Sequence, residues 1–186
     1  MKIEAGNLKK GGFVIYRDNL SQIQKAEHYM HGRGGAIMRV KFKDVESGKT
    51  MDATFRSDEI LESADVTSVR MQFLYADPQG AHFMDESYNQ YSVAASIIGE
   101  YLEYLKEGDP YFVYLYKDQA VAIRPPASVN LKVTETEDAV RGDRVSAGRK
   151  KAVVETGATV MVPLFVKNGD LIVINPETGE YVERVK

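Results

Sequence analysis

The residues with the clearest chemical potential form a short basic loop, His31-Gly32-Arg33-Gly34-Gly35, which places one arginine between glycines. Glycine tolerates positive φ and lets a backbone approach another molecule closely. A guanidinium is permanently charged and offers a planar fork of donors suited to phosphates and nucleobase edges. The loop could therefore present Arg33 to an anionic partner, or it could be an ordinary solvated turn.

Strands are predicted on both sides of this loop, which makes the loop the tip of a hairpin. The strand before it covers residues 22–29, and the strand after it alternates at the two-residue period of a sheet. One face of the second strand carries Ala36, Met38, Val40 and Phe42, and the other carries Ile37, Arg39, Lys41 and Lys43. The basic row Arg39, Lys41 and Lys43 could follow a phosphate backbone, although basic side chains on a strand also discourage aggregation.

Composition restricts the class of protein. The chain has 186 residues, of which 44% are hydrophobic and 27% charged, as in ordinary globular proteins. It has no cysteine, which excludes disulfides and thiol nucleophiles. No segment approaches the roughly 20 apolar residues of a membrane span, and the N-terminal residues lack an apolar signal core. We therefore expect a cytoplasmic protein with no membrane partner.

The charge is unevenly divided when the chain is cut at two predicted linkers, the polar stretch 57–65 and Pro125-Pro126. Residues 1–64 hold 11 basic and 9 acidic side chains, residues 65–126 hold 4 and 9, and residues 127–186 hold 9 and 9. The net charges are therefore +2, −5 and 0. A second basic cluster comprises Arg141, Arg144, Arg149, Lys150 and Lys151. Two basic loops beside an acidic middle suit local contact with nucleic acid, and both could also be solvated loops.

Short strands dominate the rest of the pattern, which is typical of small β-barrels. They are predicted at residues 12–16, 51–55, 69–75, 81–84, 111–117, 120–124, 129–134, 151–155, 159–166 and 170–175. One helix is predicted over residues 94–106, where five apolar residues share a helical face and Gly108 supplies a stop. These residues are Ile97, Ile98, Tyr101, Leu102 and Leu105. We expect an all-β chain whose one short helix plugs or flanks a barrel.

Catalytic and metal-binding signatures are not found in the sequence. The three histidines, His28, His31 and His82, are poorly spaced for a metal, and there is no nucleotide-binding loop or serine elbow. His28 and His31 could touch RNA at the hairpin or simply be solvated there, and His82 is most simply a strand residue. We predict no catalytic residue and no bound metal.

An aromatic strand in the acidic middle segment has two interpretations. Tyr111, Phe112, Tyr114 and Tyr116 could stack single-stranded bases on the face of a barrel, or they could pack in its core. The segment is short of the cations that hold a phosphate backbone, which makes this face a poor place for RNA.

The last segment carries a long and specific motif. It includes Glu155-Thr156-Gly157-Ala158, then residues 160–166, Gly169-Asp170 and residues 178–184. Supporting motifs are Arg33 in its glycine tip, Thr54-Phe55-Arg56-Ser57, Leu74-Tyr75, His82-Phe83-Met84-Asp85, Pro125-Pro126 and Arg141-Gly142-Asp143. Together these segments resemble the bacterial translation elongation factor P family, and the resemblance runs along essentially the whole chain.

This resemblance implies three domains in an L-shaped, tRNA-like arrangement. They are an SH3-like or KOW-like barrel over residues 1–64 and two OB barrels over residues 65–126 and 127–186. It also implies a monomeric, non-enzymatic factor without a cofactor, which binds the ribosome (rRNA and ribosomal proteins) between the peptidyl and exit tRNA sites. There it would promote peptide bond formation at consecutive prolines by positioning the acceptor end of the peptidyl-tRNA.

The resemblance further implies roles for particular residues. His31, Gly32, Arg33, Gly34 and Gly35 are expected at the tip that meets the peptidyl-tRNA. Arg39, Lys41 and Lys43 are assigned to the rRNA or tRNA backbone. Arg141, Gly142, Asp143, Arg144, Tyr181 and Arg184 are expected to contact the codon and the small subunit.

The tip position admits more than one chemistry, and the whole chain admits more than one function. In many members of the family the position of Arg33 is a lysine with an added extension, and some arginine members are rhamnosylated. Arginine excludes the lysine chemistry, and it leaves open whether an arginine rhamnosyltransferase modifies Arg33. The alternatives for function are a paralogue with another ribosomal target and a free-standing OB protein that binds single-stranded RNA.

Overall fold

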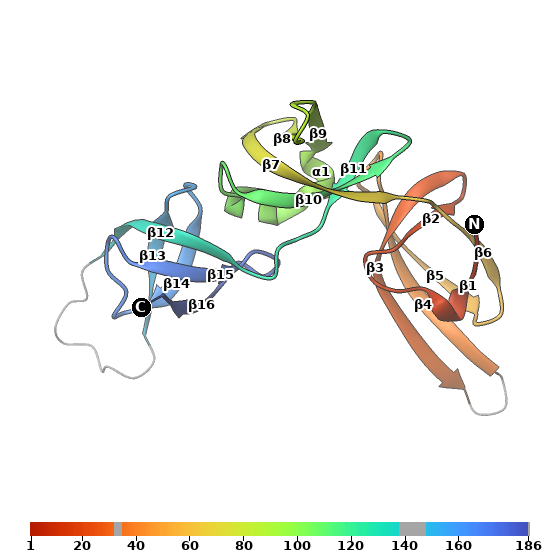
Figure 1. Ribbon diagram of the computed structural model, residues 1–186. Helices are drawn as coiled ribbons and strands as arrows, with labels where there is room; N and C mark the ends of the chain where they lie inside the picture. The colour runs from red at the N-terminus through yellow and green to blue at the C-terminus, as the bar shows by residue number, and fades with distance from the viewer. Residues whose placement is uncertain (32–34, 138–147, 186) are drawn as a thin grey trace.

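Three antiparallel sheets, each curled into a nearly closed barrel, follow one another along the chain (Figure 1). The computed structural model describes residues 1–31, 35–137 and 148–185. The expected all-β chain with one short helix is confirmed. Within the described ranges, no helix is long and apolar enough to cross a membrane.

The first barrel is a six-stranded sheet in the order β1-β6-β2-β3-β4-β5. Its elements are β1 (Lys2–Glu4), the 3-10 helix η1 (Ala5–Asn7), β2 (Phe13–Tyr16), β3 (Asn19–His31), β4 (Gly35–Asp44), β5 (Thr50–Arg56) and β6 (Ile60–Ser63). Strands β1 and β6 were not predicted, because each has only three or four residues. Strand β6 lies inside the polar stretch interpreted as a linker, yet it buries Leu61 in the first core.

The second barrel has the strand order β11-β10-β7-β8-β9. Its elements are β7 (Thr67–Asp77), β8 (Gly80–Met84), β9 (Gln90–Ala94), α1 (Ala95–Ile98), the 3-10 helix η2 (Gly99–Tyr104), β10 (Pro110–Tyr116) and β11 (Gln119–Ile123). Strands β9 and β11 lie beside each other, which brings the sheet close to closure. A bulge at Leu74 bends the long strand β7, as barrel closure requires.

The predicted helix over residues 94–106 is wrong in its extent. The α-helix ends at Ile98, because Gly99 has a φ of 75° that an α-helix does not accommodate, and the chain continues as a 3-10 helix. The break divides the apolar residues between two destinations. Ile97, Ile98 and Leu105 enter the second core, whereas Tyr104 enters the third.

The third barrel has the strand order β14-β13-β12-β15-β16. Its elements are β12 (Val129–Thr136), β13 (Arg149–Val154), β14 (Thr159–Pro163), β15 (Leu171–Asn175) and β16 (Glu180–Arg184). The first four agree with predicted strands. Strand β16 was missed because most of its side chains are exposed and give no alternating pattern.

An apolar interface joins the first barrel to the second. Phe13, Leu20 and Val45 of the first barrel pack into the second core. The Phe13 ring meets the Tyr114 ring edge-on, with centroids 5.1 Å apart. The Lys43 ammonium donates a hydrogen bond to the carbonyl oxygen of Ile97 at 2.7 Å. These contacts reach helix α1 directly from strand β4.

The 3-10 helix η2 joins the second barrel to the third. Tyr104 is only 6% exposed and packs in the third core, while Tyr101 contacts both cores. Gly179, in the turn between β15 and β16, lies so close that an added Cβ would be 2.8 Å from the Tyr104 hydroxyl. Its φ of 68° also favours glycine. We call residues 95–104 the hub, because they contact all three barrels.

The hub gives the molecule a bent, L-like outline (Figure 1). The second barrel lies between the other two, and the long β3–β4 hairpin points away from the line that joins the second and third barrels. The first and third barrels meet at the exposed Lys10–Glu177 ion pair, and the hairpin extends away from that contact.

Replacing Tyr104 with alanine tests the hub. We expect Tyr104→Ala to cost about 3 kcal/mol, because it empties a ring-sized volume in the third core. Amide hydrogen exchange followed by mass spectrometry should become faster in β12 and β15 and stay unchanged in β2–β5. Tyr104→Phe keeps the ring and should retain protection, and equal protection in both variants would contradict the assignment.

Candidate nucleic-acid interface

The β3–β4 hairpin extends beyond the rest of the first barrel. Its register runs from Ser21 opposite Asp44 to His31 opposite Gly35. Strand β5 accompanies β4 only as far as Ile37, so the last pairs of the ladder belong to two strands alone. The predicted hairpin is therefore present, with His31 and Gly35 as its last described pair. Gly32, Arg33 and Gly34 lie outside the described residues, and their roles stay predictions.

A small polar cluster braces the hairpin where the third strand ends. Ser57 donates two hydrogen bonds to the carbonyl oxygen of Ala36, from its backbone N–H at 3.0 Å and from its hydroxyl at 2.9 Å. The Nε2 atom of His28 lies 3.1 Å from the same hydroxyl. His28 is therefore engaged in holding the two strands to the barrel rather than only solvated.

The outer face of β3, β4 and β5 forms a shallow groove of about 500 Å³. Its charged lining consists of Lys25, Glu27, Arg39, Lys41 and Asp52. Glu27 is paired with Lys25 at 2.6 Å, and this hydrogen bond and charge hold the pKa of Glu27 below its usual value. Within the part of the chain that the structure describes, Arg39 and Lys41 form no ion pair within 4 Å, which leaves a local excess of positive charge.

Lys43, the third member of the predicted basic row, has a different position. Its ammonium is bound to the carbonyl of Ile97, and partial burial lowers its pKa. The side chain therefore joins two barrels and is not free to follow a phosphate backbone beside Arg39 and Lys41. The alternation of the sequence identified its face correctly and could not reveal the neighbouring barrel.

Tyr181 and Arg184 lie on β16 at the edge of the third barrel. Tyr181 packs partly against the third core. The Arg184 guanidinium lies 3.3 Å from a carboxylate oxygen of Asp170 and over the ring of Phe165, 5.4 Å from its centroid. The pKa of Asp170 is lowered, chiefly because its carboxylate accepts a hydrogen bond from the Lys167 N–H. Partial burial acts against this shift, and the Arg184 guanidinium adds to it. Arg141, Gly142, Asp143 and Arg144, assigned with them to the codon and the small subunit, lie outside the described residues.

One lysine of the second predicted basic cluster is structural. Strand β13 alternates, so that Lys150 points inward with Ala152 while Arg149 and Lys151 point outward. Lys150 is only 9% exposed and donates a hydrogen bond to the carbonyl of Glu137 at 2.6 Å. It fastens the start of β13 to the end of β12, and only its neighbours can contribute surface charge.

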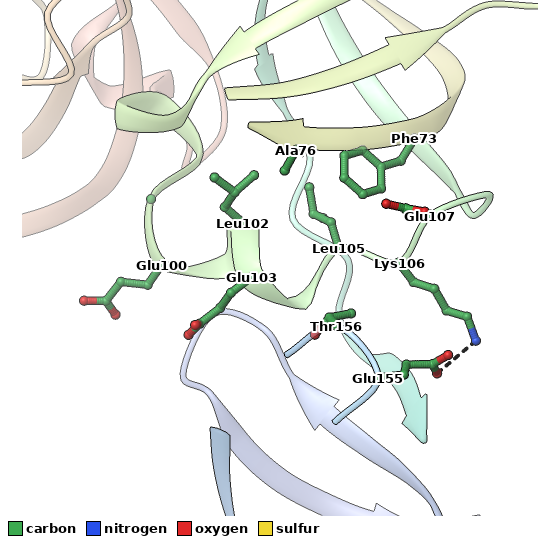
Figure 2. Close-up of a pocket in the computed structure, with 11 residues that line it drawn as sticks. Phe73, Ala76, Glu100, Leu102, Glu103, Leu105, Lys106, Glu107, Glu155 and Thr156 are labelled. Carbon is green, nitrogen blue, oxygen red and sulfur yellow. Dashed lines mark hydrogen bonds and ion pairs between the residues drawn. The ribbon is translucent and has the colours of Figure 1, made fainter. Parts of the chain in front are cut away.

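A hollow of about 820 Å³ lies between the second and third barrels (Figure 2). Leu102, Leu105 and Phe73 form part of its apolar side, and Glu155 and Thr156 lie across from them. Its lining holds four carboxylates, from Glu100, Glu103, Glu107 and Glu155, and one cation, Lys106. Lys106 is already paired with Glu155 at 3.1 Å. This concentration of negative charge makes the hollow unsuitable for RNA.

The structure thus divides the predicted site residues among separate surfaces. Arg39 and Lys41 share the first-barrel groove, and Tyr181 and Arg184 share the edge of the third barrel. The acidic second barrel lies between them. Among the described residues, no three histidine, aspartate or glutamate side chains gather as metal ligands. The arrangement can contact a large partner at two distant places.

Comparison with known families and proteins identifies this architecture. Family models match the elongation factor P KOW-like domain at residues 4–61, its OB domain at residues 66–123 and its C-terminal domain at residues 129–184. The chain is therefore a KOW–OB protein of the translation elongation factor class.

Relatives over the full length make the assignment specific. The chain is 41% identical over 184 residues to elongation factor P of Agathobacter rectalis, covering 98% of this chain and 100% of the relative. It is also 41% identical to elongation factor P of Coprothermobacter proteolyticus, covering 98% and 99%. The protein belongs to the elongation factor P family. Among solved structures, a translation initiation factor 5A from Methanococcus jannaschii is similar, with a TM-score of 0.44, 17% identity and coverage of 67% of this chain and 94% of that one.

Methionine substitution on β4 distinguishes Lys43, which is bonded to the second barrel, from Lys41, which is exposed. Lys43→Met should lower the free energy of unfolding by about 1 kcal/mol, because it leaves the Ile97 carbonyl without its charged donor. Lys41→Met, exposed on the same strand, should change it by less than about 0.5 kcal/mol. Urea unfolding followed by circular dichroism measures both. A larger effect of Lys41→Met would contradict the placement of the two side chains.

Proposed function

We propose that this protein binds the ribosome between the peptidyl and exit tRNA sites and promotes peptide bond formation at consecutive prolines. The observation that carries the proposal is membership of the elongation factor P family along all three barrels. The projecting β3–β4 hairpin and the distant third barrel support it, because they provide two contact surfaces separated along one bent molecule.

The protein would act by positioning rather than by chemistry of its own. Proline is a constrained and poor nucleophile, so peptide bond formation gains when the peptidyl-tRNA end is already held in the attack geometry. Arg33 at the hairpin tip would contact that end. A guanidinium with a pKa above about 12 cannot act as a general base, so its contribution is hydrogen bonding and charge. The ribosome remains the enzyme, and the factor needs no metal or cofactor.

The other contacts follow from the same placement. Arg39 and Lys41 would face rRNA or tRNA backbone beside the hairpin. The third barrel, with Arg141, Gly142, Asp143, Arg144, Tyr181 and Arg184, would contact the codon and the small subunit. Both interactions belong in the cytoplasm, where we place the protein as a monomer.

The state of Arg33 decides whether a further partner is needed. A bare arginine can already donate hydrogen bonds to phosphate, and a rhamnosylated arginine would extend the tip and require an arginine rhamnosyltransferase. Intact-mass measurement of the protein from its native host separates the two states, because one deoxyhexose adds a defined mass to the chain.

Arg33→Ala is the direct test of the proposed role. We expect it to abolish most of the rescue of a proline-run template in a translation system of purified components. Its free energy of unfolding should change by less than about 0.5 kcal/mol, because the three cores are built by other residues.

Lys49→Ala removes the same charge from an exposed turn of the same barrel and serves as the control. It should retain rescue. If neither the modified nor the unmodified wild-type protein relieves stalling, the proposed function is wrong. Intact rescue by Arg33→Ala would remove Arg33 from the mechanism.

A further inference from the structure

The second barrel carries a row of Arg70 on β7, Phe112 on β10 and Arg124, which directly follows β11. Strands β11, β10 and β7 are adjacent in the sheet, and Phe112 of β10 is paired with Arg70 of β7. On its other side, the Arg124 N–H donates a hydrogen bond to the carbonyl of Phe112 at 2.8 Å. The aromatic residue therefore has an arginine on each side across the sheet.

Strand alternation turns this row toward solvent. Tyr111 and Val113, the neighbours of Phe112, are buried in the second core, so Phe112 points outward and is 43% exposed. Arg70 and Arg124 are exposed as well. The alternation thus divides the aromatic strand between the core and the surface. Tyr111 packs in the core, and Phe112 presents its ring outside.

The ring and one guanidinium already form a stacked platform. The Arg124 guanidinium carbon lies 5.1 Å from the centroid of the Phe112 ring. Its Nε atom donates a hydrogen bond to the Tyr114 hydroxyl at 3.2 Å, which fixes the guanidinium in place. Preorganisation of this kind reduces the entropy lost when a ligand binds.

The charges around the platform indicate an anionic ligand. The second segment has only four basic side chains against nine acidic ones, and two of the four are Arg70 and Arg124. Within residues 1–31, 35–137 and 148–185, neither guanidinium lies within 4 Å of a carboxylate oxygen. Asp85 and Glu86 line a hollow beside Arg70. The Asp85 carboxylate accepts hydrogen bonds within its own turn from Ser87 and Asn89, so Glu86 is the acidic side chain there that a ligand would have to avoid.

We propose that Arg70, Phe112 and Arg124 bind single-stranded RNA, with a base stacked on the Phe112–Arg124 platform and adjacent phosphates at the two arginines. An acidic peptide would use the arginines and leave the ring without a partner, whereas a proline-rich peptide would use the ring and leave the charges. RNA uses both, because every base has a flat face and every nucleotide a phosphate. The site is separate from the hairpin tip and does not rest on the proposed function.

Nuclear magnetic resonance titration of the full chain with the hexanucleotide rU6 tests the proposal. Backbone amide shifts should change around residues 70, 112 and 124. Binding should be weak, and the logarithm of the association constant should fall with the logarithm of salt concentration with a slope of about −1.4, as expected for two phosphate contacts on a single strand. Phe112→Ala should weaken binding about tenfold.

Matched variants separate stacking, charge and folding. Phe112→Leu keeps an apolar side chain and loses the aromatic face, so it should weaken binding as Phe112→Ala does while its spectrum stays folded. The double variant Arg70→Gln with Arg124→Gln should abolish the salt dependence at this site. Two control variants should bind rU6 as the wild type does. Tyr75→Ala removes a ring that is 46% exposed on the same barrel, and the double variant Lys2→Gln with Lys49→Gln removes two exposed charges from the first barrel.

Three results would overturn the proposal. They are shift changes confined to other surfaces, wild-type affinity in the double arginine variant, and wild-type affinity in Phe112→Leu, which would show that no base stacks on the ring. The rescue of proline-run templates is not measured in this titration. If rU6 does not bind at this site, the proposed function is unaffected. If rescue of proline-run templates fails, the RNA platform is unaffected.

Discussion

Burial of one short segment, residues 95–104, on several sides holds the three barrels in a single body. Ile97 and Ile98 enter the second core, Tyr104 enters the third, and the Ile97 carbonyl receives the Lys43 ammonium from the first. An exposed ion pair adds little to such a joint, so the pair between Lys10 and Glu177 at 2.6 Å matters less than these buried contacts. The bent outline therefore depends on packing against the hub.

This joint explains how a chain with net charge −3 can serve an RNA-rich partner. Positive side chains are concentrated on particular faces of the first and third barrels, and the second barrel carries most of the excess acidic charge. If the hub holds the first and third barrels at a fixed separation, their relative position is already set before a partner binds. Binding then loses less conformational entropy. The family to which the chain belongs acts in translation, whose partner is itself large and structured.

Most of the fold could be predicted from the sequence, because strand alternation shows which side chains are buried. The short strands β1, β6 and β9 and the exposed strand β16 could not, since each buries too few residues to leave a pattern. The hub was misjudged for a different reason. Residues 97–105 share a helical face in projection, but Gly99 breaks the helix and sends Tyr104 to another core. Lys43 shows another limit, because only the neighbouring second barrel, through the Ile97 carbonyl, decides that its ammonium is bound and not solvated.

The central claim is that the hub fixes the distance between the first and third barrels before any partner is met. The chain has no cysteine, so Glu62→Cys and Asn168→Cys, at exposed positions of the two barrels, allow two spin labels to be attached without competing thiols. Double electron–electron resonance should give one narrow distance distribution in the free protein, and the same distribution in the presence of ribosomes. A broad distribution in the free protein, or a mean that shifts when ribosomes are added, would contradict the account.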